Sequence, residues 1–308
     1  MYSSPNDSMR KRGQSRFLPA FAVLVMSLAL VNCSDDPEET PPVSDAGTGG
    51  DNPDGGGGQD GGGGQDGGGG QDGGGEQDGG TPDAGDDGRD EPQCAPSAVR
   101  CTEESIDDLD LLTTVSTGLI REDSTTAGEF HTYVDARAGG SPQTQSYTYV
   151  RFTQQGLTQV KIDDQAALAS MDWDISFRRF IIRVNSGVSG PSCTLVARTP
   201  DGTTFESVTA VDSSWEFKAE GYYTETCEMI IHEAGLGPAT EMGSFWAYQA
   251  CLAMSGNVFV VRLADGRHVK FQVTHYYDPE PQEVCNRTGS VPAPTGAAQF
   301  RVKWAFLP

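Results

Sequence analysis

The chain has 308 residues, of which 44 are acidic and 21 are basic, so its formal net charge at pH 7 is −23. A protein that binds nucleic acid needs clustered lysines and arginines for the phosphates, and a chain this acidic is a poor candidate for that class. The glycines and many of the acidic residues are concentrated near the N-terminus, which divides the chain into three parts.

The N-terminal part resembles a bacterial lipoprotein signal. A basic region at residues 10–16 precedes an apolar run at residues 17–31, and Cys33 follows where a signal peptidase would cut. The apolar run is 15 residues long and contains Pro19, whereas a helix that crosses a bilayer needs about 20 residues. We therefore expect residues 1–32 to be removed and Cys33 to be lipidated, in preference to a retained membrane span.

A lipid on Cys33 predicts attachment to the cell envelope, most simply to the outer membrane. Ser34 after the cysteine is compatible with outer-membrane sorting, while Asp35 and Asp36 leave the sorting and the side of the membrane open. Asn32 also departs from the Gly, Ala or Ser that usually precedes a lipidated cysteine.

Residues 33–93 are predicted to be a disordered tether. The segment from Ser34 to Gln93 holds 17 acidic residues, one arginine and 22 of the 39 glycines, and no aromatic residue. Such a segment cannot bury enough apolar surface to offset the entropy lost on ordering. A calcium-binding glycine-aspartate roll is the alternative, but the repeat lacks the apolar residue that packs successive turns. The repeat is Gly-Gly-Gly-Gly-Gln-Asp, around Asp60, Asp66 and Asp72.

Six cysteines lie in the remaining part, residues 94–308. An exported chain with an even number of cysteines is expected to form disulfides. Zinc ligation is disfavoured because the spacings are wide and no Cys-x-x-Cys pair occurs. Six cysteines allow 15 pairings; closeness in sequence favours Cys94 with Cys101 and Cys227 with Cys251, and leaves Cys193 and Cys285.

Residues 94–308 are predicted to form one all-β domain, an antiparallel multi-stranded sheet or sandwich. Apolar residues recur with period two, which is typical of strands, and helix signals are few. The expected strands are Ser146–Thr153, Trp173–Ile182, Cys193–Arg198, Trp215–Ala219, Cys227–His232 and Phe300–Phe306, and the expected short helices are Asp163–Ser170 and Ser244–Met254.

The strongest local signal is a β-hairpin. Asp265-Gly266 lies between two strand-like runs, 257–264 and 267–277, and is the dipeptide that favours a two-residue turn. That turn predicts a register in which Arg262 faces Val269, Val260 faces Phe271 and Val258 faces Val273.

Three blocks of the sequence form a recognisable series: Trp173–Arg179, Val184–Gly187, and Val258–Gly266 continuing through Lys270–Tyr277. In this order they resemble the HmuY family, haem-binding lipoproteins of bacterial surfaces. The resemblance extends from about residue 147 to residue 304. It implies an all-β fold, haem capture for iron acquisition, and haem or a haem receptor as partners.

Family members hold haem between two axial side chains, His with His or Met, that project from loops at one end of the sheet. The corresponding stretch, between Gly187 and Val258, offers one histidine, His232, and three methionines. Met242 lies in a loop, which favours an exposed thioether, whereas Met229 and Met254 have strand-like or packing positions. We expect His232 and Met242 to ligate haem, with Met229 as the substitute, and Trp246 or Tyr223 to pack against the porphyrin.

The same residues can also be explained by structural roles that involve no ligand. His232 is also explained as a surface residue at a strand end, and the aromatic residues between the second and third blocks as core or loop anchors. The domain's net charge of about −10 argues for weaker capture of an anionic porphyrin. A surface protein that keeps the fold without haem, and a glycan-binding module, remain alternatives.

An enzyme is not predicted. Ser189, in Gly187-Val188-Ser189-Gly190, misses the spacing of a hydrolase nucleophile elbow, and the stretch 232–236 lacks the second histidine of a zinc protease helix. The sequence therefore predicts neither catalytic nor metal-binding residues.

Overall fold

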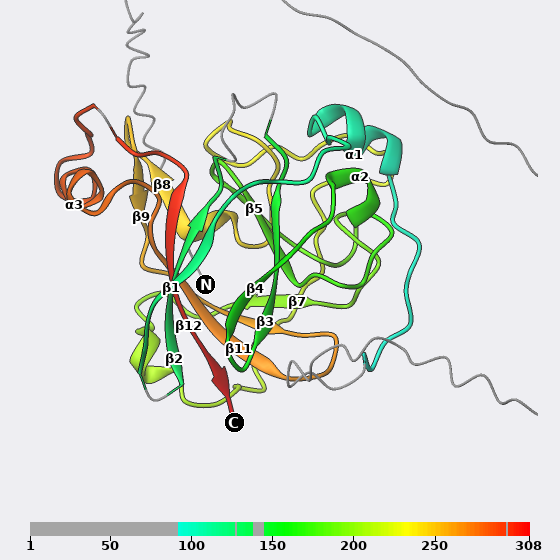
Figure 1. Ribbon diagram of the computed structural model, residues 1–308, viewed down its shortest axis with the longest axis horizontal. Helices are drawn as coiled ribbons and strands as arrows, with labels where there is room; N and C mark the ends of the chain where they lie inside the picture. The colour runs from blue at the N-terminus through cyan, green and yellow to red at the C-terminus, as the bar shows by residue number, and fades with distance from the viewer. Residues whose placement is uncertain (1–91, 127, 138–144, 294) are drawn as a thin grey trace, which may run out of the picture. The chain divides into compact units, whose positions relative to one another are not determined.

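A computed structural model describes residues 92–126, 128–137, 145–293 and 295–308. These residues form antiparallel β-sheets with few helices (Figure 1), so the all-β prediction is confirmed. The predicted signal peptide, Cys33 and almost all of the predicted tether lie outside the described residues. Among the helices of the described part, none has the length and apolar character needed to cross a membrane.

Two sheets face each other across the main core. The larger has six antiparallel strands, in the order β1 (Ile120–Thr126), β2 (Glu129–Asp135), β12 (Gln299–Leu307), β11 (His268–His275), β10 (Val258–Arg262) and β7 (Leu195–Arg198). The smaller has four, in the order β4 (Gly156–Val160), β3 (Thr148–Thr153), β5 (Ile175–Arg178) and β6 (Ile181–Val184).

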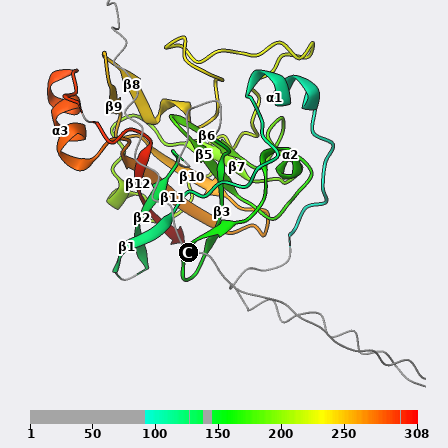
Figure 2. The same ribbon diagram turned by 45° about the horizontal axis from the view of Figure 1, so that its top comes forward.

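The remaining elements lie around these sheets. The helices are α1 (Thr102–Asp108), α2 (Asp164–Ala167) and α3 (Pro279–Thr288), with 3-10 turns η2 (Phe205–Ser207) and η3 (Gly243–Phe245). A separate hairpin is formed by β8 (Trp246–Tyr248) and β9 (Leu252–Met254). Both views place α3 with this hairpin at one side of the sheets and α1 with α2 at the other (Figures 1 and 2).

The main core is built from aromatic rings that meet between the sheets. Phe152 of β3 contacts Trp304 of β12 and Phe271 of β11 edge to face, at centroid distances of 5.0 and 6.2 Å. Phe177 of β5 contacts Phe300 of β12 at 5.3 Å. Each of these rings is fully buried.

Polar contacts close both corners of the sandwich. Glu122 of β1 accepts hydrogen bonds from Thr132 Oγ1 at 2.6 Å and from the Leu157 amide of β4 at 2.7 Å, which joins the two sheets at one edge. At the other edge an isolated bridge pairs Ser186, after β6, with Cys193, before β7. Neither sheet therefore leaves all of its edge backbone unpaired.

All six later cysteines are paired, which confirms the disulfides, but both predicted pairings are wrong. Cys94 lies beside the β10–β11 turn, where the Gln93 amide donates to Ala264 O at 2.7 Å, whereas Cys101 lies directly before α1. A bridge requires Cα atoms within about 7 Å, and the fold brings together cysteines that are distant in sequence. The bridges are Cys94–Cys193, Cys101–Cys227 and Cys251–Cys285.

The β10–β11 hairpin exists, but its predicted register is wrong by one residue. Arg262 pairs with His268 and Val260 with Lys270. The Leu263 amide donates to Arg267 O, so the loop has three residues, and Gly266 has a φ of 87°. A type I turn followed by a residue of positive φ is the usual three-residue hairpin loop. The shift places Phe259 opposite Phe271, on the face that forms the main core.

Other local predictions need smaller corrections. Trp173–Ile182 is a hairpin of β5 and β6 rather than one strand, because Arg179 has a φ of 51° and turns the chain. The predicted helix Ser244–Met254 is η3 followed by the β8–β9 hairpin. In the described chain, Trp215–Ala219 and Cys227–His232 form only isolated bridges, while Asp163 caps the predicted helix α2 through two backbone amides.

Candidate functional site

His232 lies at the mouth of a tight loop. Ile231 pairs with Pro238, and the His232 amide donates to Gly237 O at 3.0 Å. The chain returns because Gly235 and Gly237 have φ values of 71° and 67°, a conformation that glycine adopts without strain. The imidazole is thereby held at a fixed position at the surface.

The imidazole of His232 stacks on the indole of Trp246, the first residue of β8. Their ring centroids are 4.6 Å apart and their planes are inclined by 27°. Gly243 permits this approach, since a Cβ at that position would lie 2.9 Å from His232 Cδ2. Phe180 meets the same indole edge to face at 5.8 Å. Together with Tyr248, which is 54% exposed, these residues form what we call the aromatic end: Phe180, His232, Trp246 and Tyr248.

A hydrogen bond to the His232 ring determines which ring nitrogen carries the proton and which can bind a metal. The Ala234 amide donates to Nδ1 at 3.2 Å. A neutral imidazole whose Nδ1 accepts carries its proton on Nε2. Histidines that bind a metal through one nitrogen usually donate a hydrogen bond from the other. Ligation through Nε2 therefore requires His232 to lose the bond from Ala234.

Met242 is fully buried in the main core, so the expectation of an exposed thioether is wrong. The segment around it is held by two of its own amides: the Glu241 amide donates to the side-chain Oε2 of Glu220 at 3.1 Å, and the Phe245 amide donates to Met242 O. The adjacent Gly243 meets the His232 ring, but the Met242 side chain packs in the core.

Met229 and Tyr223 form a separate pair. They are partners in an isolated antiparallel bridge, and the Tyr223 hydroxyl donates to Asp108 Oδ2 at 3.1 Å. Both pack in a second group of buried residues. Of the five predicted site residues, the fold brings His232 and Trp246 into contact, places the backbone beside Met242 next to them, and puts Met229 and Tyr223 elsewhere.

Glu220 is a structural determinant of this region that the sequence did not indicate. Its carboxylate accepts the Val184 amide at 3.0 Å and the Glu241 amide at 3.1 Å, so it ties β6 to the segment that carries Met242. Burial raises the pKa of Glu220 to about 8, against the lowering effect of the two amides. A lone glutamate between Ala219 and Gly221 carries no signal of such a role.

The other histidines take different positions. His131 of β2 bonds to Glu129 at 2.9 Å, and His268 and His275 are the first and last residues of β11. His275 bonds to Thr274 Oγ1 at 3.0 Å. In the described chain, His232 therefore shares no strand or helix with the other three histidines. Ser189, excluded above as a nucleophile, is buried with its hydroxyl bonded to that of Tyr222.

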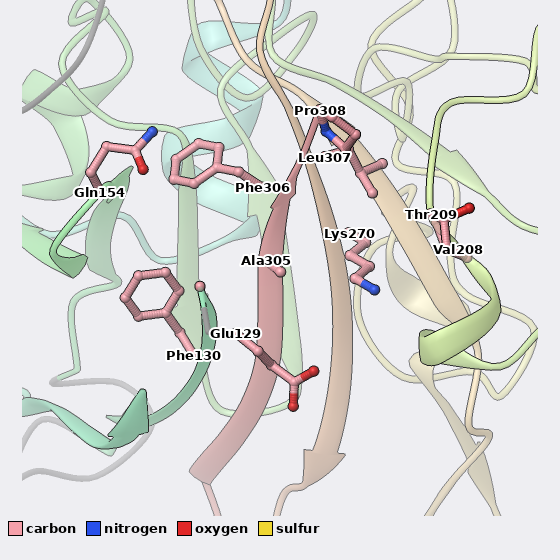
Figure 3. Close-up of a pocket in the computed structure, with 11 residues that line it drawn as sticks. Glu129, Phe130, Gln154, Val208, Thr209, Lys270, Ala305, Phe306, Leu307 and Pro308 are labelled. Carbon is pink, nitrogen blue, oxygen red and sulfur yellow. The ribbon is translucent and has the colours of Figure 1, made fainter. Parts of the chain in front are cut away.

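A pocket of about 410 Å³ lies away from the aromatic end, between the start of β2 and the C-terminal end of β12. Figure 3 shows Glu129 and Lys270 in its wall, on the strands that flank β12, with Val208 and Thr209 across from them. The Lys270 ammonium lies over the Phe205 ring at 4.3 Å and donates to Phe205 O at 3.0 Å. None of the predicted site residues lines this pocket.

Residues 143–288 match the HmuY protein family. A search of curated proteins gave no match. Solved structures similar to this chain include an HmuY-like haem-binding protein from Bacteroides vulgatus, with 16% identity, a TM-score of 0.37, and coverage of 60% of this chain and 94% of the other.

Two further solved structures are similar at the same level. A lipoprotein from Bacteroides fragilis has 13% identity and a TM-score of 0.37, with coverage of 60% of this chain and 92% of the other. The apo form of an HmuY analogue from Tannerella forsythia has 15% identity and a TM-score of 0.32, with coverage of 65% and 99%.

Proposed function

Residues 143–288 match the HmuY protein family, and from that premise we propose that this chain belongs to it and is a lipid-anchored cell-envelope protein that binds haem at its aromatic end. In this proposal residues 1–32 are the signal peptide, Cys33 carries the lipid, residues 33–93 are the tether and residues 94–308 are the haem-binding domain. His232 is the axial ligand.

The observation that carries the proposal is the stack of the half-buried imidazole of His232 on Trp246. Imidazole nitrogen is a common axial ligand of haem iron. Aromatic rings beside it, those of Phe180 and Tyr248, offer faces and edges against which a flat macrocycle packs.

The fit of His232 to haem is incomplete in one respect. Its Nδ1 accepts the Ala234 amide, so ligation through Nε2 gives up a hydrogen bond whose net contribution is about 1 kcal/mol. A carbonyl or carboxylate acceptor at Nδ1 would have favoured the ligating tautomer. We therefore expect weaker haem binding than at a histidine already held in that tautomer, in line with the negative charge of the domain.

Met254 replaces Met242 as the candidate for a second ligand. Met254 is half-buried and is the cross-strand partner of Trp246 in the β8–β9 hairpin, so the two side chains project to the same face. Met242 lies in the core and Met229 beside Tyr223. The sequence suggested packing for Met254, and it does pack against the main core, but it is not enclosed there.

Titration of the purified protein with haemin tests this assignment. The wild type should give a Soret band, His232→Ala should lose it or bind at least tenfold more weakly, and Met254→Ala should shift its position. His275→Ala is the control, because His275 is a half-buried histidine on β11, and it should bind as the wild type does. Equal titrations of wild type and His232→Ala would remove His232 from the site.

A haem-free interaction protein is the second candidate, and the bond from Ala234 to Nδ1 favours it. An absence of any Soret band from the wild type would decide for it. The glycan-binding alternative has less support, because most of the aromatic residues between the second and third blocks are buried, namely Tyr222, Tyr223, Phe245 and Trp246.

The lipid anchor has its own test. Cys33→Ser should move the protein from the membrane fraction to the soluble fraction. Membrane association of the variant that resists salt and carbonate would contradict lipidation.

A further inference from the structure

The face of the four-stranded sheet that points away from the main core carries a row of polar side chains. Tyr149 of β3 is in register with Ser176 of β5, and Ser176 with Arg183 of β6. Tyr147 and Arg178 extend the row on the same strand faces. We call these five residues, with Asp164 of α2, the Arg183 cluster; Leu109, Leu111, Leu168 and Tyr222 belong to the buried group that surrounds it.

Arg183 has no exposed surface. Its Nη2 donates to the Tyr149 hydroxyl at 2.8 Å, and its guanidinium carbon lies 4.0 Å from the centre of the Tyr147 ring. Its Nε and Nη1 have no hydrogen-bond partner among the described residues. An unmet buried donor costs about 1–3 kcal/mol, and more when it belongs to a charged group.

Two neutral hydroxyl groups beside Arg183 also lack hydrogen-bond partners. The Tyr147 hydroxyl and Ser176 Oγ are both buried and both lack a partner in the described part of the chain. Ser176 is the cross-strand neighbour of Arg183, and Tyr147 stacks on its guanidinium. The unpartnered donors of Arg183, Tyr147 and Ser176 thus come from three neighbouring strand segments, and none has an acceptor within hydrogen-bond distance among the described residues.

Arg178 and Arg183 share one charged neighbour, Asp164. Arg178 and Arg183 are both buried cations. Asp164 accepts the Leu112 and Tyr147 amides and the Tyr149 hydroxyl, and lies 4.0 Å from Arg178, so it offsets one of them. Two further carboxyls are buried nearby: Asp174, directly before β5, accepts the Phe152 amide at 2.8 Å, and burial raises the pKa of Glu220 to about 8, which favours its neutral form.

We propose that Arg183 holds a chloride ion inside the domain, with the hydroxyls of Tyr147 and Ser176 completing its donors. A buried charge requires a partner of opposite sign. A water molecule would satisfy the donors but would leave the positive charge of Arg183 uncompensated. A small monovalent anion accepts the hydrogen bonds and also compensates the charge. The site is separate from the aromatic end and does not depend on haem binding.

Thermal unfolding in matched salts tests the proposal. The Tm of the wild type should be higher in sodium chloride than in sodium gluconate at the same ionic strength, because an ion that binds only the folded state stabilises it. Tyr147→Phe, which removes one donor, should raise the half-saturating chloride concentration about fivefold. Tyr277→Phe is the control: it deletes a buried hydroxyl of the main core that accepts the Leu252 amide, and it should keep the wild-type chloride dependence.

Crystals grown in sodium bromide give a direct readout. An anomalous peak within hydrogen-bond distance of Arg183 Nε or Nη1 is expected. A peak there without anomalous signal, together with equal Tm values in the two salts, would overturn the proposal in favour of an internal water.

Discussion

The main core and the Arg183 cluster lie on opposite faces of the same four-stranded sheet, and both exclude solvent. The main core joins apolar rings from regularly alternating strand positions, such as Phe152, Phe177 and Trp304. The Arg183 cluster joins charged and hydroxyl side chains, covered by segments that come from distant parts of the chain.

This difference separates two ways of stabilising a buried face. Apolar contacts are non-directional, and their contribution scales with the area removed from water. Buried charges contribute only when every partner is in place, and removing one partner leaves the other uncompensated. The outer face is therefore expected to be more sensitive to single polar substitutions and to pH than the main core is.

The largest expected effect is that of Asp164→Ala. Asp164 is the carboxylate that receives the Tyr149 hydroxyl and two amides beside Arg178, so its removal should lower the free energy of unfolding by about 3–5 kcal/mol. Urea denaturation measures it. The neighbouring Asp163→Ala, which removes the cap of α2, should lose only about 1 kcal/mol. Equal losses in the two variants would show that charge does not organise this face.

Removal of disulfides should have the next largest effects, and unequal ones. The Cys101–Cys227 bridge closes 126 residues, beside the Arg183 cluster, whereas Cys251–Cys285 closes 34 residues, at the aromatic end. Replacing both cysteines of a bridge by serine should cost about 2–4 kcal/mol, with the longer loop costing about 1 kcal/mol more on the chain-entropy account. Denaturant midpoints of the two double variants, measured without reductant, test the order. The reverse order would show that local packing outweighs loop length.

The pH dependence of stability should come from Glu220. Because burial raises its pKa to about 8, the folded state keeps a proton that the unfolded state releases above about pH 4.5. The free energy of unfolding should then fall as pH rises from about 4.5 to 8, by at most about 1.4 kcal/mol per pH unit. Glu220→Gln should flatten this slope, and Glu233→Gln, at an exposed position, should keep it. A slope that is the same in all three proteins would exclude Glu220 as its source.

The sequence predicted the regularly alternating strands of the main core better than it predicted turns and register. Period-two alternation identified β3 and β12, because inward and outward positions of a half-buried strand differ in polarity. It failed on the register of β10 and β11, since both faces of β10 carry buried apolar residues and Asp265-Gly266 suits loops of two or three residues. The start and end of α3 had recognisable signals, Pro279 at the first turn and Gly289 with a φ of 70°, which the sequence analysis missed.

The candidate site was predictable only in part. His232 and Trp246 were singled out as residues, but their contact depends on the loop at Gly235 and on the close approach at Gly243. The segment of Met242 is held through the Glu241 amide by Glu220, a residue 21 positions away from it, and the partners of the six cysteines depend on the complete fold. No local pattern encodes such contacts, because their members lie far apart in the chain.

The smallest expected effect concerns the aromatic end and comes from Gly243→Ala. The added Cβ would lie 2.9 Å from His232 Cδ2, so the imidazole must move from the Trp246 ring. The stability cost should be about 1 kcal/mol, near the lower limit for overpacking, because the displaced ring lies at the surface. Trp246 emission should change, while the unfolding midpoint moves little. Gly221→Ala, where a Cβ would meet only Ala219 O at 3.8 Å, is the control and should leave the emission unchanged. If haem is bound through His232, the same Gly243→Ala variant should alter haemin affinity; unchanged emission and unchanged affinity together would mean that the stack is not the feature that positions this histidine.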